Sequence, residues 1–393
     1  MAVRSGYRRW LTVALLTVSL PATTAAGAAV TTAPGAAVTP PPGAAVTPPP
    51  GAAVTMAAGA AVTAATGTDV SLTVGGRAVL LDVSGSEGRP RASARFSATA
   101  GQRLSVLARR KTLTAVDNTD LVVRRDGTTV AEGTLPITWS EVTVDFTAPA
   151  AGTYTVEVRP RAKDHGTLLV SLAGATAGAL TVGGEPQRVA VTKPGERVFL
   201  TFDAPADEDL TLVARRGSMP RDEYTHLEVR GPGGEPEAIG AVGYGAEYRT
   251  LDFTTTVGGS HTVEVNPDTV RTGTLMVHLA GTVTAALTPG RPARITLARP
   301  GDRGRVTFRA AEDEQFRLTA RRDTLTGSEQ TRLRLTTPAG LDVADGTLTT
   351  GKAVVTLSFS SSAGVYTLDV DPDGLDAGSL ILELTRLTEA GLT

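Results

Sequence analysis

The chain has 393 residues, which is enough for roughly two to four domains of ordinary size. Hydrophobic residues make up 41% of the chain but only 4% are aromatic, and the 43 glycines and 24 prolines favour short elements separated by turns over long helices. The absence of cysteine excludes disulfide frameworks, zinc fingers and thiol catalysis, and a net charge of −2 gives no electrostatic support for nucleic acid as a partner.

Residues 1–26 have the features of an export signal. Several arginines precede an apolar run over 10–20, and small residues surround Gly27. This order is typical of a cleaved secretory signal, and we expect cleavage before Gly27. The apolar run is shorter than the about 20 residues that span a bilayer, so a permanent membrane anchor is the weaker alternative. The mature chain is expected outside the cytoplasm without a transmembrane segment, either secreted or associated with the cell wall.

Residues 27–67 form a low-complexity segment. The phrase Gly-Ala-Ala-Val-Thr begins at residues 27, 35, 43, 51 and 59, and no charged or aromatic residue interrupts the segment. Such a composition has nothing to bury against the entropy of ordering, and its proline triplets favour an extended polyproline II conformation. The pattern predicts a disordered stalk that spaces the rest of the chain from a surface.

From about residue 69 the chain repeats itself three times. Ala108-Arg109-Arg110 returns as Ala214-Arg215-Arg216 and Ala320-Arg321-Arg322, and a Gly-Thr-Tyr-Thr-Val phrase at 152–156 returns near 259 and 364. Because about 100 residues can bury a core alone, each repeat is expected to be one domain. The predicted boundaries are 68–175, 176–282 and 283–393.

Within each repeat the hydrophobic period is two. Tyr154, Val156 and Val158 share one face of the phrase at 152–158, while polar residues share the other, which is the alternation of a half-buried strand. Many short alternating segments separated by Gly and Asp turns predict an all-β fold of three tandem antiparallel β-sandwiches. The recurring phenylalanines are expected to fill the space between the sheets: Phe96, Phe202 and Phe308, and Phe146, Phe253 and Phe359.

The order of these motifs resembles a known family. Phe96, the turn at 100–102, an Asp-Gly turn, Ala151 to Val156 and a final Gly-Thr-Leu strand are similar to the bacterial pre-peptidase C-terminal domain. The resemblance implies jelly-roll-like, non-catalytic sandwiches that accompany secreted enzymes or stand in series in surface proteins. The second repeat departs from the pattern, with His261 in place of the tyrosine.

Motifs for catalysis are absent from the sequence, so we expect no enzymatic activity and no cofactor. The four histidines have no metal-ligand spacing to one another, and His261 is expected to be a buried core residue. Asp369, Asp371 and Asp373 resemble the start of a calcium loop, but Pro372 dictates a turn. A turn sequence is the favoured interpretation of these aspartates, and a calcium site is the alternative.

The paired arginines are the most informative polar feature. Along the first such strand the buried positions are Leu104, Val106 and Ala108, so Arg110 falls where a core residue is due. A guanidinium is costly to bury without partners, so we expect backbone carbonyls or an acid to hold it at the rim of the sandwich. The functional alternative is that the pairs bind an anionic wall polymer or a carboxylate-rich partner. The residues concerned are Arg109, Arg110, Arg215, Arg216, Arg321 and Arg322.

Three aromatic residues exceed the pattern that the repeats share. Trp139, Tyr244 and Tyr248 are candidates for a carbohydrate-binding patch, because sugars stack on exposed rings, and packing at an edge strand is the alternative.

These features together predict an exported, non-catalytic repeat protein that acts as an extracellular or cell-surface spacer, adhesin or binding module. Its partner would be a cell-wall polymer, another extracellular polymer or a protein. The short joints at 173–179 and 280–286 predict a semi-rigid array. The alternatives are a polysaccharide-binding protein or an accessory of a secreted hydrolase, and an enzyme or inhibitor whose site is assembled from loops.

Overall fold

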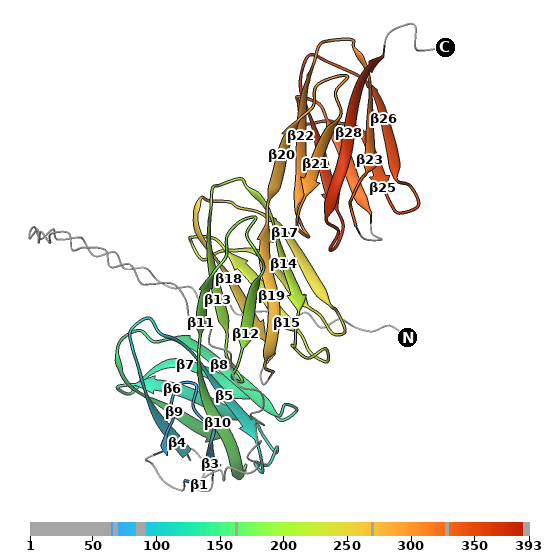
Figure 1. The fold of residues 1–393 in the computed structure, drawn as a ribbon. Coiled ribbons are helices and arrows are strands. Elements are labelled where there is room, and N and C mark those ends of the chain that lie inside the picture. Colours follow the sequence, from blue (N-terminus) through green and yellow to red (C-terminus); the bar gives the residue numbers. More distant parts are fainter. Residues whose placement is uncertain are drawn as a thin grey trace, which may run out of the picture. The chain divides into compact units, whose positions relative to one another are not determined.

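The computed structural model describes residues 64–65, 70–83, 92–161, 164–268, 271–326 and 330–387. The predicted signal at 1–26 and nearly all of the predicted stalk lie outside these residues. The described segments contain 28 strands and no helix, which confirms the all-β prediction (Figure 1). Accordingly, no helix that could cross a membrane occurs in them.

The first repeat is a sandwich of two sheets. Its strands are β1 Ala64–Ala65, β2 Val70–Ser71, β3 Val79–Val83, β4 Ala92–Ala98, β5 Arg103–Arg110, β6 Thr119–Arg125, β7 Thr128–Leu135, β8 Glu141–Thr147, β9 Gly152–Pro160 and β10 Gly166–Gly174. One sheet has the order β1-β3-β10-β5-β8 and the other β2-β4-β9-β6-β7. Pairing is antiparallel except for β1 with β3 and β2 with β4. The short parallel strand β1 falls within the predicted stalk.

The second and third repeats have the same topology, except that their described residues contain no counterpart of β1. The second contains β11 Thr176–Ala179, β12 Gln187–Val191, β13 Val198–Ala204, β14 Asp209–Arg216, β15 Thr225–Arg230, β16 Pro236–Val242, β17 Tyr248–Thr254, β18 Gly259–Pro267 and β19 Gly273–Ala280. The third contains β20 Thr282–Ala286, β21 Ala293–Leu297, β22 Arg303–Ala310, β23 Gln315–Arg322, β24 Thr331–Thr336, β25 Asp342–Leu348, β26 Val354–Ser360, β27 Gly364–Pro372 and β28 Gly378–Leu387. Their sheets have the orders β12-β19-β14-β17 and β11-β13-β18-β15-β16, then β21-β28-β23-β26 and β20-β22-β27-β24-β25.

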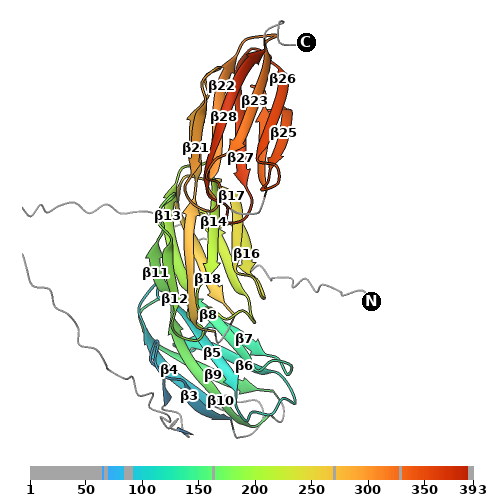
Figure 2. The same cartoon turned by 45° about the vertical axis from the view of Figure 1, so that its right-hand side comes forward.

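Each repeat has its own hydrophobic core between its two sheets, and Figure 2 shows the two layers of strands. The alternation in β9 turns Tyr154 inward, where its ring stacks on Phe96 with centroids 5.4 Å apart. Phe308 and Tyr366 repeat this contact at 5.4 Å in the third core. In the second core His261 occupies the tyrosine position, fully buried as expected.

Candidate functional site at the junctions between repeats

Arg110, at the end of β5, is held by backbone carbonyls. Its guanidinium donates hydrogen bonds to the carbonyl oxygens of Thr114, Leu135, Pro136 and Trp139 at 2.7 to 3.3 Å. Burial lowers the pKa of this arginine, although the group stays a cation at neutral pH. The carbonyl contacts are those expected of an arginine that closes the rim of the sandwich.

The equivalent arginines of the other repeats have the same kind of partner. Arg216 donates to the carbonyls of Ala246 at 2.8 Å and Gly243 at 2.7 Å, and burial lowers its pKa. Arg322 donates to the carbonyl of Leu325 at 2.8 Å. The preceding arginines lie on the opposite face of the same strands and are exposed: Arg109, Arg215 and Arg321.

The aromatic candidates are divided between two repeats. Trp139 follows β7 of the first repeat, whereas Tyr244 and Tyr248 flank the start of β17 in the second. Tyr244 is the most exposed of the three at 69%, Trp139 is 39% exposed and Tyr248 is half-buried. Trp139 and Tyr244 therefore lie in the equivalent loop of two different repeats, whereas Tyr248 is the first residue of β17.

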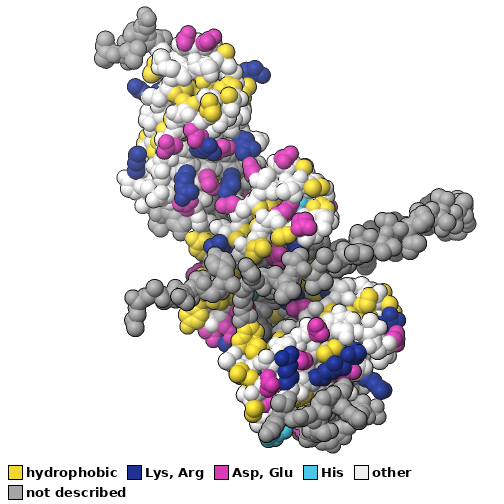
Figure 3. Space-filling model, turned by 180° about the vertical axis from the view of Figure 1, so that it is seen from behind, with side chains coloured by type: hydrophobic (Ala, Val, Ile, Leu, Met, Phe, Trp, Pro, Cys, Tyr) yellow, Lys and Arg dark blue, Asp and Glu magenta, His cyan; other side chains and the backbone are white. Residues whose placement is uncertain are grey.

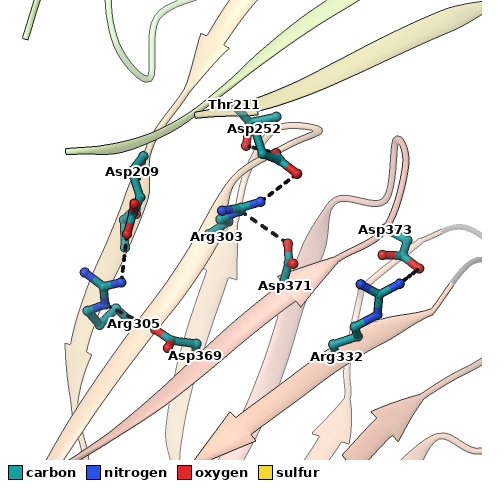
Figure 4. Close-up of polar contacts among 10 residues, drawn as sticks. Asp209, Thr211, Asp252, Arg303, Arg305, Arg332, Asp369, Asp371 and Asp373 are labelled. Atoms are coloured by element: carbon teal, nitrogen blue, oxygen red, sulfur yellow. Dashed lines mark hydrogen bonds and ion pairs between the residues drawn. The ribbon is translucent and has the colours of Figure 1, made fainter. Parts of the chain in front are cut away.

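The three aspartates of the calcium alternative point to different partners (Figure 4). Asp369 pairs with one arginine at 3.1 Å, Asp371 with a second at 3.3 Å and Asp373 with a third at 3.4 Å. No cluster of three or more metal-ligating side chains occurs in the described part of the chain. The geometry gives the calcium alternative no support.

His261 forms a buried pair with a residue to which no local sequence pattern connects it. Its Nδ1 lies 2.9 Å from the carbonyl oxygen of Gly259, and its Nε2 lies 3.4 Å from a carboxylate oxygen of Glu237, whose side chain is only 3% exposed. Glu237 also accepts hydrogen bonds from the amide and hydroxyl of Thr256, both at 3.0 Å. The ring stacks on Phe202 at 5.0 Å, so this pair is part of the core.

The junctions between repeats contain polar contacts that join neighbouring repeats. A single residue separates β10 from β11 and β19 from β20, so one repeat leads directly into the next. Residues 104–108 of β5 and 210–214 of β14 are buried without interruption, although only every second side chain faces a core. A strand with this pattern is covered on both faces.

A turn of the following repeat provides the second cover. Gly301, in the turn before β22, has φ +81°, and a Cβ atom there would lie 2.7 Å from Cγ2 of Val213 in β14. Gly195, in the turn before β13, has φ +78°, and its Cβ would lie 3.4 Å from Cβ of Leu107 in β5. Each turn therefore lies directly on the outward face of the preceding repeat, and glycine permits both the backbone conformation and the close approach.

Next to each turn an arginine bridges the two repeats. Arg197 pairs with Asp145 of the first repeat and with Glu264 of its own repeat. Arg303, at the equivalent position, pairs with Asp252 of the second repeat at 2.8 Å and with an aspartate of its own repeat (Figure 4). We call Arg197 and Arg303 the clamp arginines. Their carboxylate partners are oriented by hydroxyl groups of the preceding strand, Ser105 and Thr211.

A second contact has different chemistry at the two junctions. At the first, the guanidinium of Arg103 lies 4.1 Å from the ring centroid of Phe199. At the second, the equivalent positions hold Asp209 and Arg305, which form an ion pair at 3.0 Å. Hydrogen bonds from Thr254 and Arg305 lower the pKa of Asp209 despite partial burial, which opposes them. Both junctions thus have a clamp arginine. The neighbouring contact is a cation–π pair at the first junction and an ion pair at the second, so both of its residues differ between the junctions.

The pKa values of two carboxylates beside the clamp arginines are raised, in contrast to that of Asp209. Desolvation raises the pKa of Asp145, and the charge of Arg197 opposes this effect only in part. Desolvation likewise raises the pKa of Asp371 beside Arg303. The clamps therefore lie in partly dehydrated surroundings, where ion pairs are screened less by salt than on an open surface.

Comparison with known proteins agrees with the fold. The family model described as "Bacterial pre-peptidase C-terminal domain" matches residues 91–160, so the first repeat is a domain of this kind. No curated protein matches the chain. This match is consistent with an extracellular accessory or binding module.

Several solved structures are also similar. A pre-peptidase C-terminal domain of collagenase from Bacillus anthracis is 17% identical over 26% of this chain and 96% of its own, with a TM-score of 0.23. PliG of Aeromonas hydrophila, a periplasmic inhibitor of g-type lysozyme, is 17% identical over 27% of this chain and 98% of its own, with a TM-score of 0.19. ZmpB of Clostridium perfringens, an M60 catalytic domain with two CBM51 domains, is 9% identical over 75% of this chain but only 34% of its own, with a TM-score of 0.17. At these scores no functional inference follows.

Proposed function

We propose that the protein is an exported, non-catalytic array of three β-sandwiches that spaces and presents binding surfaces outside the cell. The observation that carries the proposal is the repeated junction, in which a glycine turn covers the preceding repeat and a clamp arginine pairs across the boundary. Domains joined by flexible linkers would not need such a contact. It is useful where the distance and orientation of successive modules must be held.

Further features support an extracellular and non-catalytic role. The sequence begins with the pattern of an export signal, and the family of the matched domain implies non-catalytic modules. Several arginines of the repeats are held by backbone carbonyls or carboxylates, among them Arg110, Arg303 and Arg305. Figure 3 shows basic and acidic side chains interspersed over the surface of the third repeat.

Electron–electron distance measurement between spin labels tests this proposal. The chain has no cysteine, so labels can be introduced at two exposed positions, Val116→Cys in the first repeat and Leu341→Cys in the third. A narrow distance distribution is expected. The substitution Arg303→Gln should broaden it, whereas Arg309→Gln, an exposed arginine on the same strand, should not.

Two results would contradict the proposal. A distribution in the parent protein as broad as that of a flexible linker would remove the fixed junction. Turnover of peptide, ester or glycoside substrates by the purified protein would remove the non-catalytic assignment.

A further inference from the structure

A hollow of about 470 Å³ lies at the first junction and is lined by both repeats. The first repeat contributes Arg103 and Thr147 to its lining, and the second contributes Phe199, Ser260 and Thr262. Its volume falls in the ordinary range for sites that bind small ligands, roughly 300 to 1,000 Å³. The hydroxyl groups, the ring and the guanidinium thus surround one space.

The charges that line the hollow are not all balanced within the protein. Arg197 is engaged by Asp145 and Glu264, and Arg230 pairs with Glu228 at 2.8 Å. The guanidinium of Arg103, by contrast, makes no hydrogen bond or ion pair with any described residue. Its contact is the stack on a phenyl ring, which fixes the plane of the group and leaves its N–H edges available.

The second junction provides an internal comparison. There the position of Arg103 is taken by Asp209 and that of Phe199 by Arg305, and the two close the contact as an ion pair at 3.0 Å. Both junctions therefore have a side-chain contact between the two repeats at these positions. Among the described residues, only the first junction keeps at this place a positive charge without an acidic partner.

We propose that this hollow binds an acidic saccharide. The carboxylate of a uronic acid unit would accept two hydrogen bonds from Arg103, because a planar guanidinium matches a carboxylate in bidentate geometry. Hydroxyl groups of Thr147, Ser260 and Thr262 would exchange hydrogen bonds with those of the sugar. The choice of a saccharide over other carboxylates rests on this hydroxyl lining and on the extracellular role proposed above.

Ligand-observed NMR titration of the full chain tests the site. The acidic probe is digalacturonate, the neutral probe is lactose, and a triglutamate peptide represents carboxylates without sugar hydroxyls. Digalacturonate is expected to bind, more weakly as salt is added, while lactose and triglutamate bind at least tenfold more weakly. Arg103→Gln should weaken digalacturonate binding by roughly ten- to a hundredfold, the range for losing a hydrogen bond to a charged group. Arg309→Gln, which removes an exposed arginine of the third repeat away from the hollow, is the matched control.

A second variant separates ligand binding from the junction itself. The double substitution Arg103→Asp with Phe199→Arg installs the ion pair of the second junction at the first. It should leave the melting temperature and the spin-label distance unchanged and abolish binding. Retained binding in this variant, equal losses in R103Q and R309Q, equal affinity for lactose, or tighter binding of triglutamate would each overturn the proposal. No binding of digalacturonate with an intact narrow distance distribution would overturn the saccharide site and leave the proposed spacer function standing.

Discussion

The substitution Gly301→Ala isolates the contact between two repeats from the stability of either one. The residue lies in a turn of the third repeat that is buried against the second repeat, and it belongs to no hydrophobic core. Its φ of +81° and its distance from β14 are nevertheless both specific to glycine. A methyl group there would lie 2.7 Å from Cγ2 of Val213, 3.0 Å from Cγ2 of Thr211 and 3.2 Å from Cβ of Ala280.

The expected cost has two parts. A side chain in the left-handed region costs about 1 to 2 kcal/mol. Contacts of 2.7 to 3.2 Å also lie well inside the ordinary separation of carbon atoms, so the turn must move away or strain its neighbours, at about 1 to 3 kcal/mol. Moving away is the easier response, because the ion pairs beside the turn are partly exposed and worth only about 0 to 1 kcal/mol each.

Gly340 provides a matched control. It has φ +78° in a hairpin of the same repeat, and a Cβ atom there would meet nothing within 4 Å. Gly340→Ala therefore carries only the conformational cost. Gly195→Ala, with its nearest contact at an ordinary 3.4 Å, should be intermediate.

Hydrogen–deuterium exchange is the assay that distinguishes these variants. Val213 and its neighbours in β14 are covered by the turn, so G301A should speed exchange there and broaden the spin-label distance, while G340A does neither. Equal exchange in β14 for G301A and G340A would refute the reasoning, because the turn would then make no contact that matters to the second repeat.

Further predictions concern single repeats. His261→Tyr alone should cost about 1 to 3 kcal/mol in urea denaturation, because it takes the imidazole away from a buried carboxylate oxygen of Glu237, and adding Glu237→Val should restore most of that loss. Arg216→Lys should lower the melting temperature of the second repeat nearly as much as Arg216→Gln, because one ammonium group cannot reach the separate carbonyls that the guanidinium bridges. The pKa of Asp209 is lowered in the folded state, so its contribution is present above the unfolded value of about 3.9 and is lost as the pH falls; Asp209→Asn should therefore flatten the acid limb of a stability profile. A chelator should leave the melting temperature unchanged, and a fall would revive the calcium alternative.

The fold could be predicted because its signals are local. Alternation over 152–158 fixes which side chains face inward, and the return of the same phrases fixes how many cores there are. The break in that alternation at Arg110 correctly indicated a charge at the rim. Its carbonyl partners come from loops on either side of two other strands, and no local pattern reveals them.

The junctions could not be predicted in this way. Asp145 and Arg197 are far apart in sequence, and both side chains point away from the core of their own sandwich. Charged residues are common at such positions and need no partner there. One sequence feature does indicate a covered surface, although it carries little weight alone. Leu107 and Val213 are apolar at positions that point away from the core. Isolated apolar residues on a surface are common, so only a covering turn gives them meaning.

Comparison with the third repeat shows which residues the sandwich fold requires and which serve the contact with a following repeat. The third repeat has the strand order of the second repeat and the stacked Phe–Tyr pair of the first. Yet Arg317, Thr319 and Ser358 stand at the positions of Thr211, Val213 and Asp252, and β23 returns to the ordinary alternation of buried and exposed side chains. Because the fold persists without the hydroxyl, the apolar side chain and the carboxylate, these three are not requirements of the fold. Their recurrence in the first two repeats, where a following turn covers them, is therefore best explained by the contact between repeats.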